Sequence, residues 1–236
     1  ATEEKKGASF DIEAHHKLAR KAAQESIVLL KNEDNILPLQ TGTKVAVIGD
    51  FAQTPRYQGA GSSLVNPAKQ PESILGEIGN SGLEMVAFEQ GYRRNKKGNA
   101  KLIERAKEVA KKAEVVLIFA GLDEISESEG LDRTHMNMPQ AQNMLIDEIS
   151  TVNPNVVVVL SAGSAVEMPW YSYVRGIVHG YLGGQAGASA MLNVLTGKVC
   201  PSGKLNETYP VHCDFCLDQM MEQEDNSTDT APSYLM

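Results

Sequence analysis

The sequence has few cysteines, no long apolar stretch and no excess of positive charge. Three cysteines are too few for a disulfide framework, and free thiols without the apolar core of a signal peptide favour a cytoplasmic location. No apolar run approaches the roughly 18 residues that a membrane-spanning helix needs. A formal net charge of −8 gives no electrostatic basis for binding nucleic acid. We therefore expect neither nucleic acid nor membrane as a partner.

Two of the cysteines, Cys213 and Cys216, have the C-x-x-C spacing that occurs in redox and metal sites. A zinc site needs a second pair of ligands, and only His212 lies nearby in the sequence. No helix start follows the pair, as a thioredoxin-like motif would require. We interpret both residues as incidental thiols, and we expect no metal site and no cofactor.

Apolar residues make up 42% of the 236 residues, which is typical of a chain with a packed core. Short, β-branched apolar runs predict strands at residues 44–49, 84–89, 115–120, 156–160 and 176–181, and a short edge strand at 207–209. Periodic patterns predict helices at residues 12–31, 73–78, 100–113, 140–152 and 183–195.

This alternation of strands and helices indicates one α/β domain. We expect a three-layer sandwich with a mostly parallel sheet between helices, formed by residues 1–212. Residues 213–236 are acidic and polar, and we expect them to form a loose tail or a segment that packs on a domain absent from this chain.

One loop is distinguished by its length and its charge. Residues 121–139 join a predicted buried strand to a helix that should begin near Pro139. This loop of roughly 18 residues exceeds the 2–6 usual for such connections, and long loops in compact domains are usually functional or disordered. Ligands of open α/β sheets bind beyond the carboxyl ends of the strands, where this loop should lie. A solvated acidic loop is the alternative interpretation. Its charged residues are Asp123, Glu124, Glu127, Glu129, Asp132 and Arg133.

A second loop follows the first clear strand and contains GAGSS at residues 59–63. Its glycines allow close backbone approach, and its serines offer hydroxyls to a polar ligand. It is not a dinucleotide-binding fingerprint, because Leu64 stands where the third glycine would be. Taken alone, the segment is more simply interpreted as a flexible turn.

Five segments together resemble a known family, in order and with consistent spacing. They are KNE to LPL at residues 31–39, GAGSS at 59–63, SEGLDR at 128–133, LGGQAG at 182–187, and LTGK to PSGKL at 195–205. With them, residues 14–210 resemble the α/β sandwich domain of glycoside hydrolase family 3, the β-glucosidase family. Each motif alone is weak, and the five together are specific.

The resemblance implies an active site between this sandwich and a (β/α)8 barrel that carries the nucleophilic aspartate. Such a barrel takes about 250 residues and is absent from this chain. By the same resemblance, Glu129 is the catalytic acid/base, and Ser62, with Ser63 beside it, reaches the sugar being cleaved. The implied partners are a β-linked glucoside or short oligosaccharide and the barrel domain of the parent enzyme.

The chemistry requires the acid to carry a raised pKa. Retaining hydrolysis uses two carboxyl groups about 5–5.5 Å apart, one as the nucleophile and one to protonate the leaving oxygen. Glu129 would gain the raised pKa only when its loop closes over the barrel and the sugar. We expect Arg133 to fix the loop through Asp132 or nearby carbonyls, because a cation on Glu129 would lower its pKa. Glu127, on the same side of an extended loop, is an alternative proton donor.

The sequence thus predicts the acid/base-bearing domain of a retaining, exo-acting, β-glucosidase-like hydrolase, inactive on its own. The missing barrel leaves a second hypothesis open, a stand-alone carbohydrate-binding or interaction module without activity. A parent of the β-xylosidase type is also open, because the choice of sugar depends mainly on barrel residues.

Overall fold

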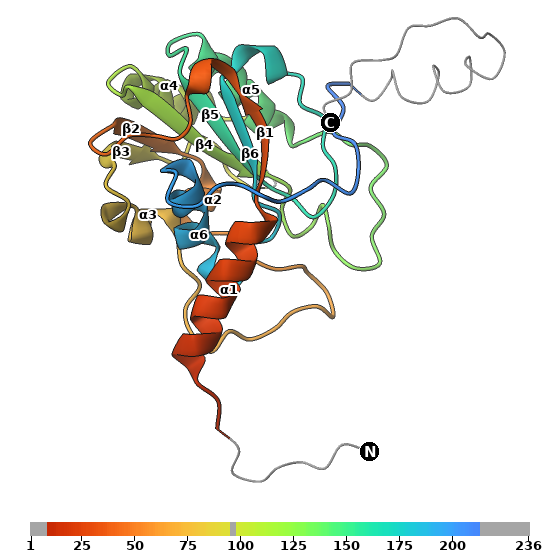
Figure 1. Ribbon diagram of the computed structural model, residues 1–236. Coiled ribbons are helices and arrows are strands. Elements are labelled where there is room, and N and C mark those ends of the chain that lie inside the picture. The colour runs from red at the N-terminus through yellow and green to blue at the C-terminus, as the bar shows by residue number, and fades with distance from the viewer. Residues whose placement is uncertain (1–8, 95–97, 213–236) are drawn as a thin grey trace, which may run out of the picture.

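The computed structural model describes residues 9–94 and 98–212. Its central layer is a six-stranded sheet with the order β1-β6-β5-β4-β2-β3 (Figure 1). Neighbouring strands are parallel, apart from β1 and β6, which are antiparallel. The strands are β1 Val28–Asn32, β2 Lys44–Ile48, β3 Glu84–Glu89, β4 Val115–Gly121, β5 Val156–Ser161 and β6 Gly176–His179.

Helices cover both faces of the sheet, which confirms the three-layer α/β sandwich. One face carries α4 Ala100–Ala110 and α5 Gln140–Ser150. The other face carries α1 Ile12–Ser26, α2 Asp50–Gln53, α3 Ile74–Glu77 and α6 Gly187–Leu195. Single 3-10 turns occupy η1 Glu33–Asn35, η2 Ile78–Asn80, η3 Tyr171–Tyr173 and η4 Gly184–Ala186.

Strand side chains alternate between two hydrophobic cores. On β4, Ile118 packs with the α4 and α5 cluster, and its neighbour Phe119 packs with the α6 cluster. All residues of β4 are buried, which explains why the sequence shows this strand as an uninterrupted apolar run.

The prediction of one helix over residues 12–31 is wrong at its end. α1 stops at Ser26, and the following apolar residues form β1, whose Val28 lies opposite His179 of β6. Apolar, partly β-branched residues fit a sheet edge as well as a helical turn, and in this chain they pair with β6 as a strand. The predicted edge strand at 207–209 is also absent from the sheet; Tyr209 is instead buried, with its hydroxyl 2.7 Å from His179 Nε2.

The predicted tail at residues 213–236, with Cys213 and Cys216, lies outside the described residues, so the domain boundary stays a prediction. Within the described ranges, no group of three or more His, Cys, Asp or Glu side chains is placed to hold a metal ion. Nor does any helix in those ranges have the length and apolar character needed to cross a bilayer.

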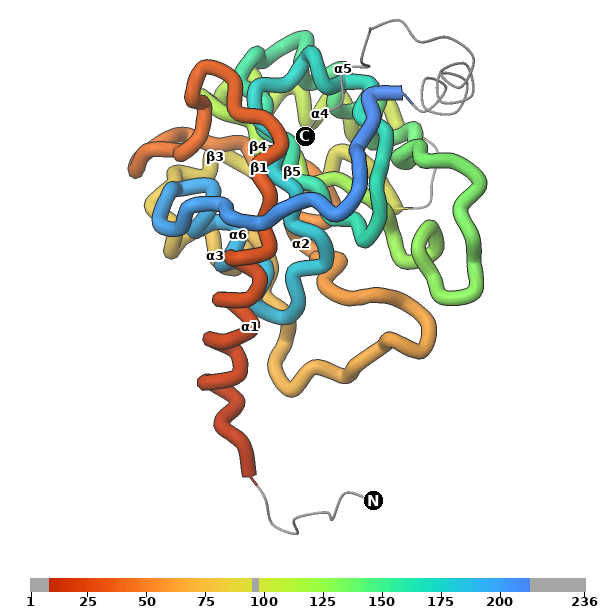
Figure 2. The backbone as a smooth tube through the Cα atoms, turned by 45° about the vertical axis from the view of Figure 1, so that its right-hand side comes forward, coloured from red at the N-terminus to blue at the C-terminus, as the bar shows by residue number. Residues whose placement is uncertain are grey.

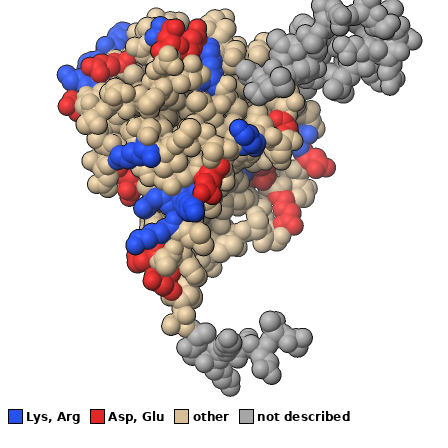
Figure 3. Space-filling view, viewed as in Figure 1, with Lys and Arg blue, Asp and Glu red and all other residues tan. Residues whose placement is uncertain are grey.

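The parallel strands end at one edge of the sheet, where several connections leave it. Residues 54–73 follow α2, residues 122–139 follow β4, and residues 162–175 follow β5. Figures 1 and 2 show the first two of these loops extending from the body on the same side as α1. On the face seen in Figure 3, acidic side chains gather at the right, where the loop after β4 lies.

Candidate active site at the carboxyl edge of the sheet

The Gly-Ser loop and the acidic loop meet at this edge. Ala60 and Ser128 form a parallel β-bridge, and the Glu129 N–H donates to the Ala60 carbonyl at 3.4 Å. Gly61 makes the approach possible, because its φ is +87° and a Cβ there would lie 2.6 Å from the Glu129 Cβ. The glycine predicted to allow close backbone approach therefore allows it toward Glu129.

Glu129 is exposed, and its carboxylate is held by the Gly-Ser loop. Its Oε2 accepts a hydrogen bond from the Ser62 N–H at 2.6 Å and another from the Ser62 hydroxyl. The hydroxyl and the N–H of Ser62 lower the pKa of Glu129, because both stabilise the ionised form. The Ser63 hydroxyl donates to the Ala60 carbonyl at 3.2 Å, within its own loop. Of the predicted site residues, Glu129 and Ser62 are thus in contact, and Ser63 faces its own backbone.

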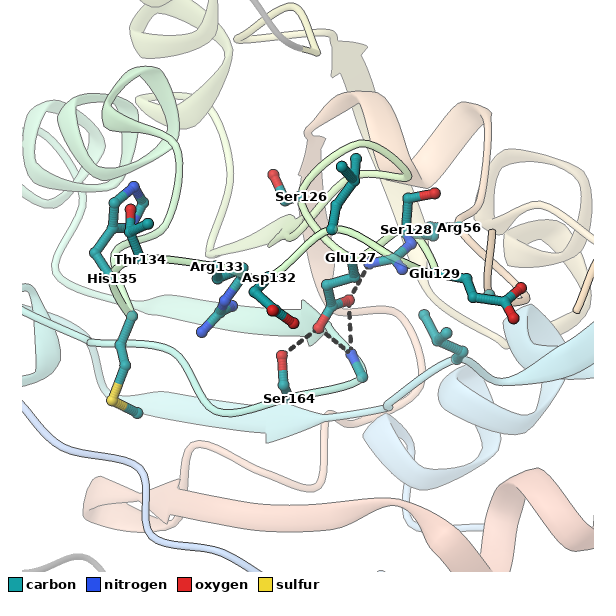
Figure 4. A pocket seen from close by; sticks show the side chains of 15 residues that line it. Arg56, Ser126, Glu127, Ser128, Glu129, Asp132, Arg133, Thr134, His135 and Ser164 are labelled. Carbon is teal, nitrogen blue, oxygen red and sulfur yellow. Dashed lines mark hydrogen bonds and ion pairs between the residues drawn. The ribbon is translucent and has the colours of Figure 1, made fainter. Parts of the chain in front are cut away.

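Glu127 has a different set of partners, although it lies only two residues away. Figure 4 shows its carboxylate directed at Ser164 and away from Glu129. It accepts hydrogen bonds from the Gly163 N–H, 2.9 Å from Oε2, and from the Ser164 hydroxyl, and it forms an ion pair with Arg56. Burial raises the pKa of Glu127, but the Ser164, Gly163 and Arg56 donors outweigh burial, so the pKa lies below its ordinary value.

The sequence motifs did not point to Arg56, which joins the two loops. Its side chain is 1% exposed, and Nη1 donates to the Leu122 carbonyl at 2.8 Å as well as to Glu127. One signal could have found it, since Arg56 is the only lysine or arginine between Lys44 and Lys69. A lone cation in a loop at the carboxyl edge of a sheet is a candidate partner for a carboxylate.

Arg133 fixes its loop through a carbonyl, as predicted, by donating from Nη2 to Ala165 at 2.7 Å. Beside these residues lies an open hollow of about 690 Å³, with Glu129 on its rim (Figure 4). Its polar lining includes Arg56, Ser126, Glu127, Asp132, Arg133 and Ser164. The arrangement presents two carboxylates with hydroxyl donors beside them to a polar ligand of small size.

Comparison with known families agrees with the motifs. The family model of the glycosyl hydrolase family 3 C-terminal domain matches residues 27–234. The chain belongs to glycoside hydrolase family 3. This confirms the resemblance that the five sequence segments carry.

Similar proteins are much longer than this chain. The thermostable beta-glucosidase B of Acetivibrio thermocellus is 49% identical over 210 residues, which cover 88% of this chain and 28% of that protein. An exo-alpha-(1->6)-L-arabinopyranosidase of Bifidobacterium longum is 44% identical over 213 residues, which cover 86% and 28%. The crystal structure of the Bifidobacterium adolescentis GH3 beta-glucosidase matches with a TM-score of 0.85 and 43% identity, over 92% of this chain and 32% of that one. This chain thus spans less than a third of each of these proteins.

Proposed function

We propose that this family 3 domain supplies the acid/base, Glu129, of a retaining, exo-acting, β-glucosidase-like glycoside hydrolase. The observation that carries the proposal is the contact between Glu129 and Ser62, which are 67 residues apart in the sequence. Both residues are implied by the family motifs, and both lie at the sheet edge where ligands of open α/β sheets bind. The relatives named beta-glucosidases support a β-linked glucoside or short oligosaccharide as the substrate.

The nucleophile is proposed to come from a (β/α)8 barrel of the parent enzyme. The chain covers 28% of the Acetivibrio thermocellus relative, so ample length remains for a barrel of about 250 residues. The exposed position of Glu129 suits this division, because a second domain can close over it and place a carboxylate about 5–5.5 Å away.

Glu129 must be protonated in one half of a retaining reaction and ionised in the other. The domain alone favours the ionised form, because Ser62 donates two hydrogen bonds to the carboxylate and lowers its pKa. Closure of the barrel would bury Glu129 and bring the negative nucleophile near it, and both changes raise a carboxyl pKa. In this proposal the barrel favours the protonated form of Glu129, which acts as the acid, and Ser62 favours the ionised form, which acts as the base.

Ser62 is also proposed to reach the sugar in the cleavage subsite, with Ser63 supporting the loop. The Ser62 hydroxyl would then exchange between Glu129 and a sugar hydroxyl as substrate enters. A parent that acts on pentosides is a second candidate for the substrate class. It is supported by the arabinopyranosidase relative and by a GH3 exo-beta-xylosidase structure that matches with a TM-score of 0.75 at 32% identity.

The test compares the 236-residue chain with its full-length parent on p-nitrophenyl β-glucoside. We expect the parent to hydrolyse this substrate and the chain alone to be inactive. In the parent, Glu129→Ala should lower kcat on cellobiose by about 10²–10⁴-fold, the range typical of a lost general acid. Activated aryl glycosides should be affected less, and azide should restore their deglycosylation.

The matched control for this change is Glu124→Ala in the same loop. The Glu124 carboxylate pairs with Arg94 at 3.0 Å, and we expect its removal to leave turnover unchanged. Normal turnover of cellobiose by Glu129→Ala would contradict the acid/base assignment. Turnover by the chain alone would instead place a nucleophile within it.

A stand-alone carbohydrate-binding module is a second candidate function. The polar hollow of about 690 Å³ favours it, because the domain forms this hollow without a barrel. Calorimetric titration of the chain with glucose and cellobiose separates the two functions. Saturable binding by the chain alone would support the module, and no binding would support the two-domain enzyme.

A further inference from the structure

We propose that Glu127 and Arg56 are positioning residues that hold the Glu129 segment in place, and that Glu127 is not a proton donor. The catalytic meaning of this inference rests on the proposed function, whereas the structural part does not. Three consecutive residues are each held by a different partner. Glu127 is held through its carboxylate, Ser128 through the backbone bridge to Ala60, and Glu129 through its contact with Ser62.

The carboxylate of Glu127 connects its loop to the end of β5. Oε1 and Oε2 lie 3.1 and 2.9 Å from the Gly163 nitrogen, and Oε1 also accepts from the Ser164 hydroxyl. The side chain is only 11% exposed, so these donors replace water around the charge. A carboxylate surrounded by donors in this way is stabilised as an anion and is poorly suited to carry a proton.

Arg56 connects the same loop to the Gly-Ser loop. Its buried guanidinium contacts the loop at two points, the Leu122 carbonyl and the Glu127 carboxylate. Between these points, Asp123 Oδ1 accepts from the N–H groups of Ile125 and Ser126 at 3.1 and 2.8 Å and shapes a turn. Because a buried charge needs its partner, Arg56 and Glu127 depend on each other.

The consequence for catalysis is a defined position for Glu129. Arg56 and Ser62 lie in one loop and Glu127 and Glu129 in another, so the ion pair and the Ser62 contact hold the two loops at two places. Catalytic groups need placement within about 0.5 Å, and a misplacement of about 1 Å can lower a rate by about 10²-fold. Loss of the Arg56–Glu127 pair should therefore act on Glu129 without removing it.

The first test uses the chain itself and backbone amide hydrogen exchange. In Glu127→Gln, we expect the amides of Ser62 and Glu129 to exchange at least about 10-fold faster, while the Leu117 amide in β4 is unchanged. The matched control Glu124→Gln should leave all three amides unchanged. The double variant Arg56→Gln with Glu127→Gln should recover part of the protection, because it leaves no unpaired buried charge. Unchanged exchange at Ser62 and Glu129 in Glu127→Gln would overturn the inference.

The second test uses the two-domain parent and its kinetics. We expect Glu127→Gln to lower kcat by about 10²-fold for both poor and activated leaving groups, with a smaller effect on KM. Azide should not rescue this variant, because the Glu129 carboxylate still occupies its place. Azide rescue of Glu127→Gln would make Glu127 the proton donor and overturn the inference, as would an unchanged kcat.

The two proposals can fail separately. Normal turnover by Glu129→Ala contradicts the proposed function and leaves the exchange result standing. If Glu127→Gln does not fold, Ser164→Ala replaces it, since it removes one donor from the Glu127 carboxylate and leaves the ion pair. We expect Ser164→Ala to show a several-fold lower kcat without azide rescue, and an unchanged kcat would again overturn the inference.

Discussion

At the scale of single residues, hydrogen-bond donors decide what each carboxylate can do. Glu127 and Glu129 are two residues apart and share one loop, but Glu127 faces a buried guanidinium and Glu129 faces a serine. The motifs drew attention to Glu129 and Ser62, because each residue stands in a short local pattern, and the structure brings the two into contact. Arg56 could not be found in this way, because its partners Leu122 and Glu127 are 66 and 71 residues away and only the fold brings them near.

The pKa of Glu129 should respond directly to Ser62. In Ser62→Ala the hydroxyl donor is lost, the ionised form is less stabilised, and the pKa of Glu129 should rise toward its ordinary value. Carbon-13 NMR titration of the Glu129 carboxyl in the chain measures this change. Ser63→Ala is the matched control, because the Ser63 hydroxyl donates to the Ala60 carbonyl, and it should leave the titration unchanged. Equal titrations in all three proteins would show that Ser62 does not tune Glu129.

At the scale of elements, sequence patterns predict the strands that burial makes uniformly apolar, and they miss the strand that depends on pairing with a distant segment. β4 and β5 were recognisable because burial on both faces makes a strand uniformly apolar. The boundary between α1 and β1 is not recognisable from the sequence, because the apolar residues after Ser26 fit a helical turn as well as a strand. Their strand conformation depends on antiparallel pairing with β6, which lies far along the chain.

Glu72 fastens α1 to α6, and its removal should lower stability. Its carboxylate, 8% exposed, lies 2.8 Å from His16 Nε2, 2.9 Å from Arg20 Nη2 and 2.9 Å from the Ser189 nitrogen. We expect Glu72→Ala to lower the free energy of unfolding by about 3 kcal/mol at pH 7, as for other broken buried ion pairs. Unfolding in urea measures this change in the free energy of unfolding. The control is Glu13→Ala in α1, whose exposed carboxylate pairs with Lys69, and this change should alter the free energy of unfolding little.

The pH dependence of this loss has a definite sign. Burial raises the pKa of Glu72, but the donors Ser189, Arg20 and His16 outweigh it, so the folded-state pKa is lowered from 4.5. The stabilisation is then fully present above about pH 4.5 and is lost as the pH falls through the folded-state pKa. The difference between wild type and Glu72→Ala should therefore narrow in acid. A difference that grows below pH 4.5 would contradict the assignment.

At the scale of the whole molecule, the two cores share their strands and should unfold together. β4 and β5 give alternate side chains to each cluster, so we expect loss of packing in one cluster to disrupt the other. The single tryptophan, Trp170, is fully buried in one cluster, with its Nε1 2.9 Å from Asn143 Oδ1, and therefore reports on that core. We expect its fluorescence and the far-UV circular dichroism of the chain to give the same midpoint in urea.

A double variant, Phe51→Trp with Trp170→Phe, places the single tryptophan on the other face of the sheet. Phe51 is buried in the cluster that packs against α6. This variant should be less stable, because the larger ring overpacks its site, but its fluorescence and circular dichroism should again share one midpoint. Different midpoints within either protein would mean that the layers unfold separately. A single transition in both would mean that the two cores form one cooperative unit, from whose carboxyl edge the loops with Ser62 and Glu129 extend.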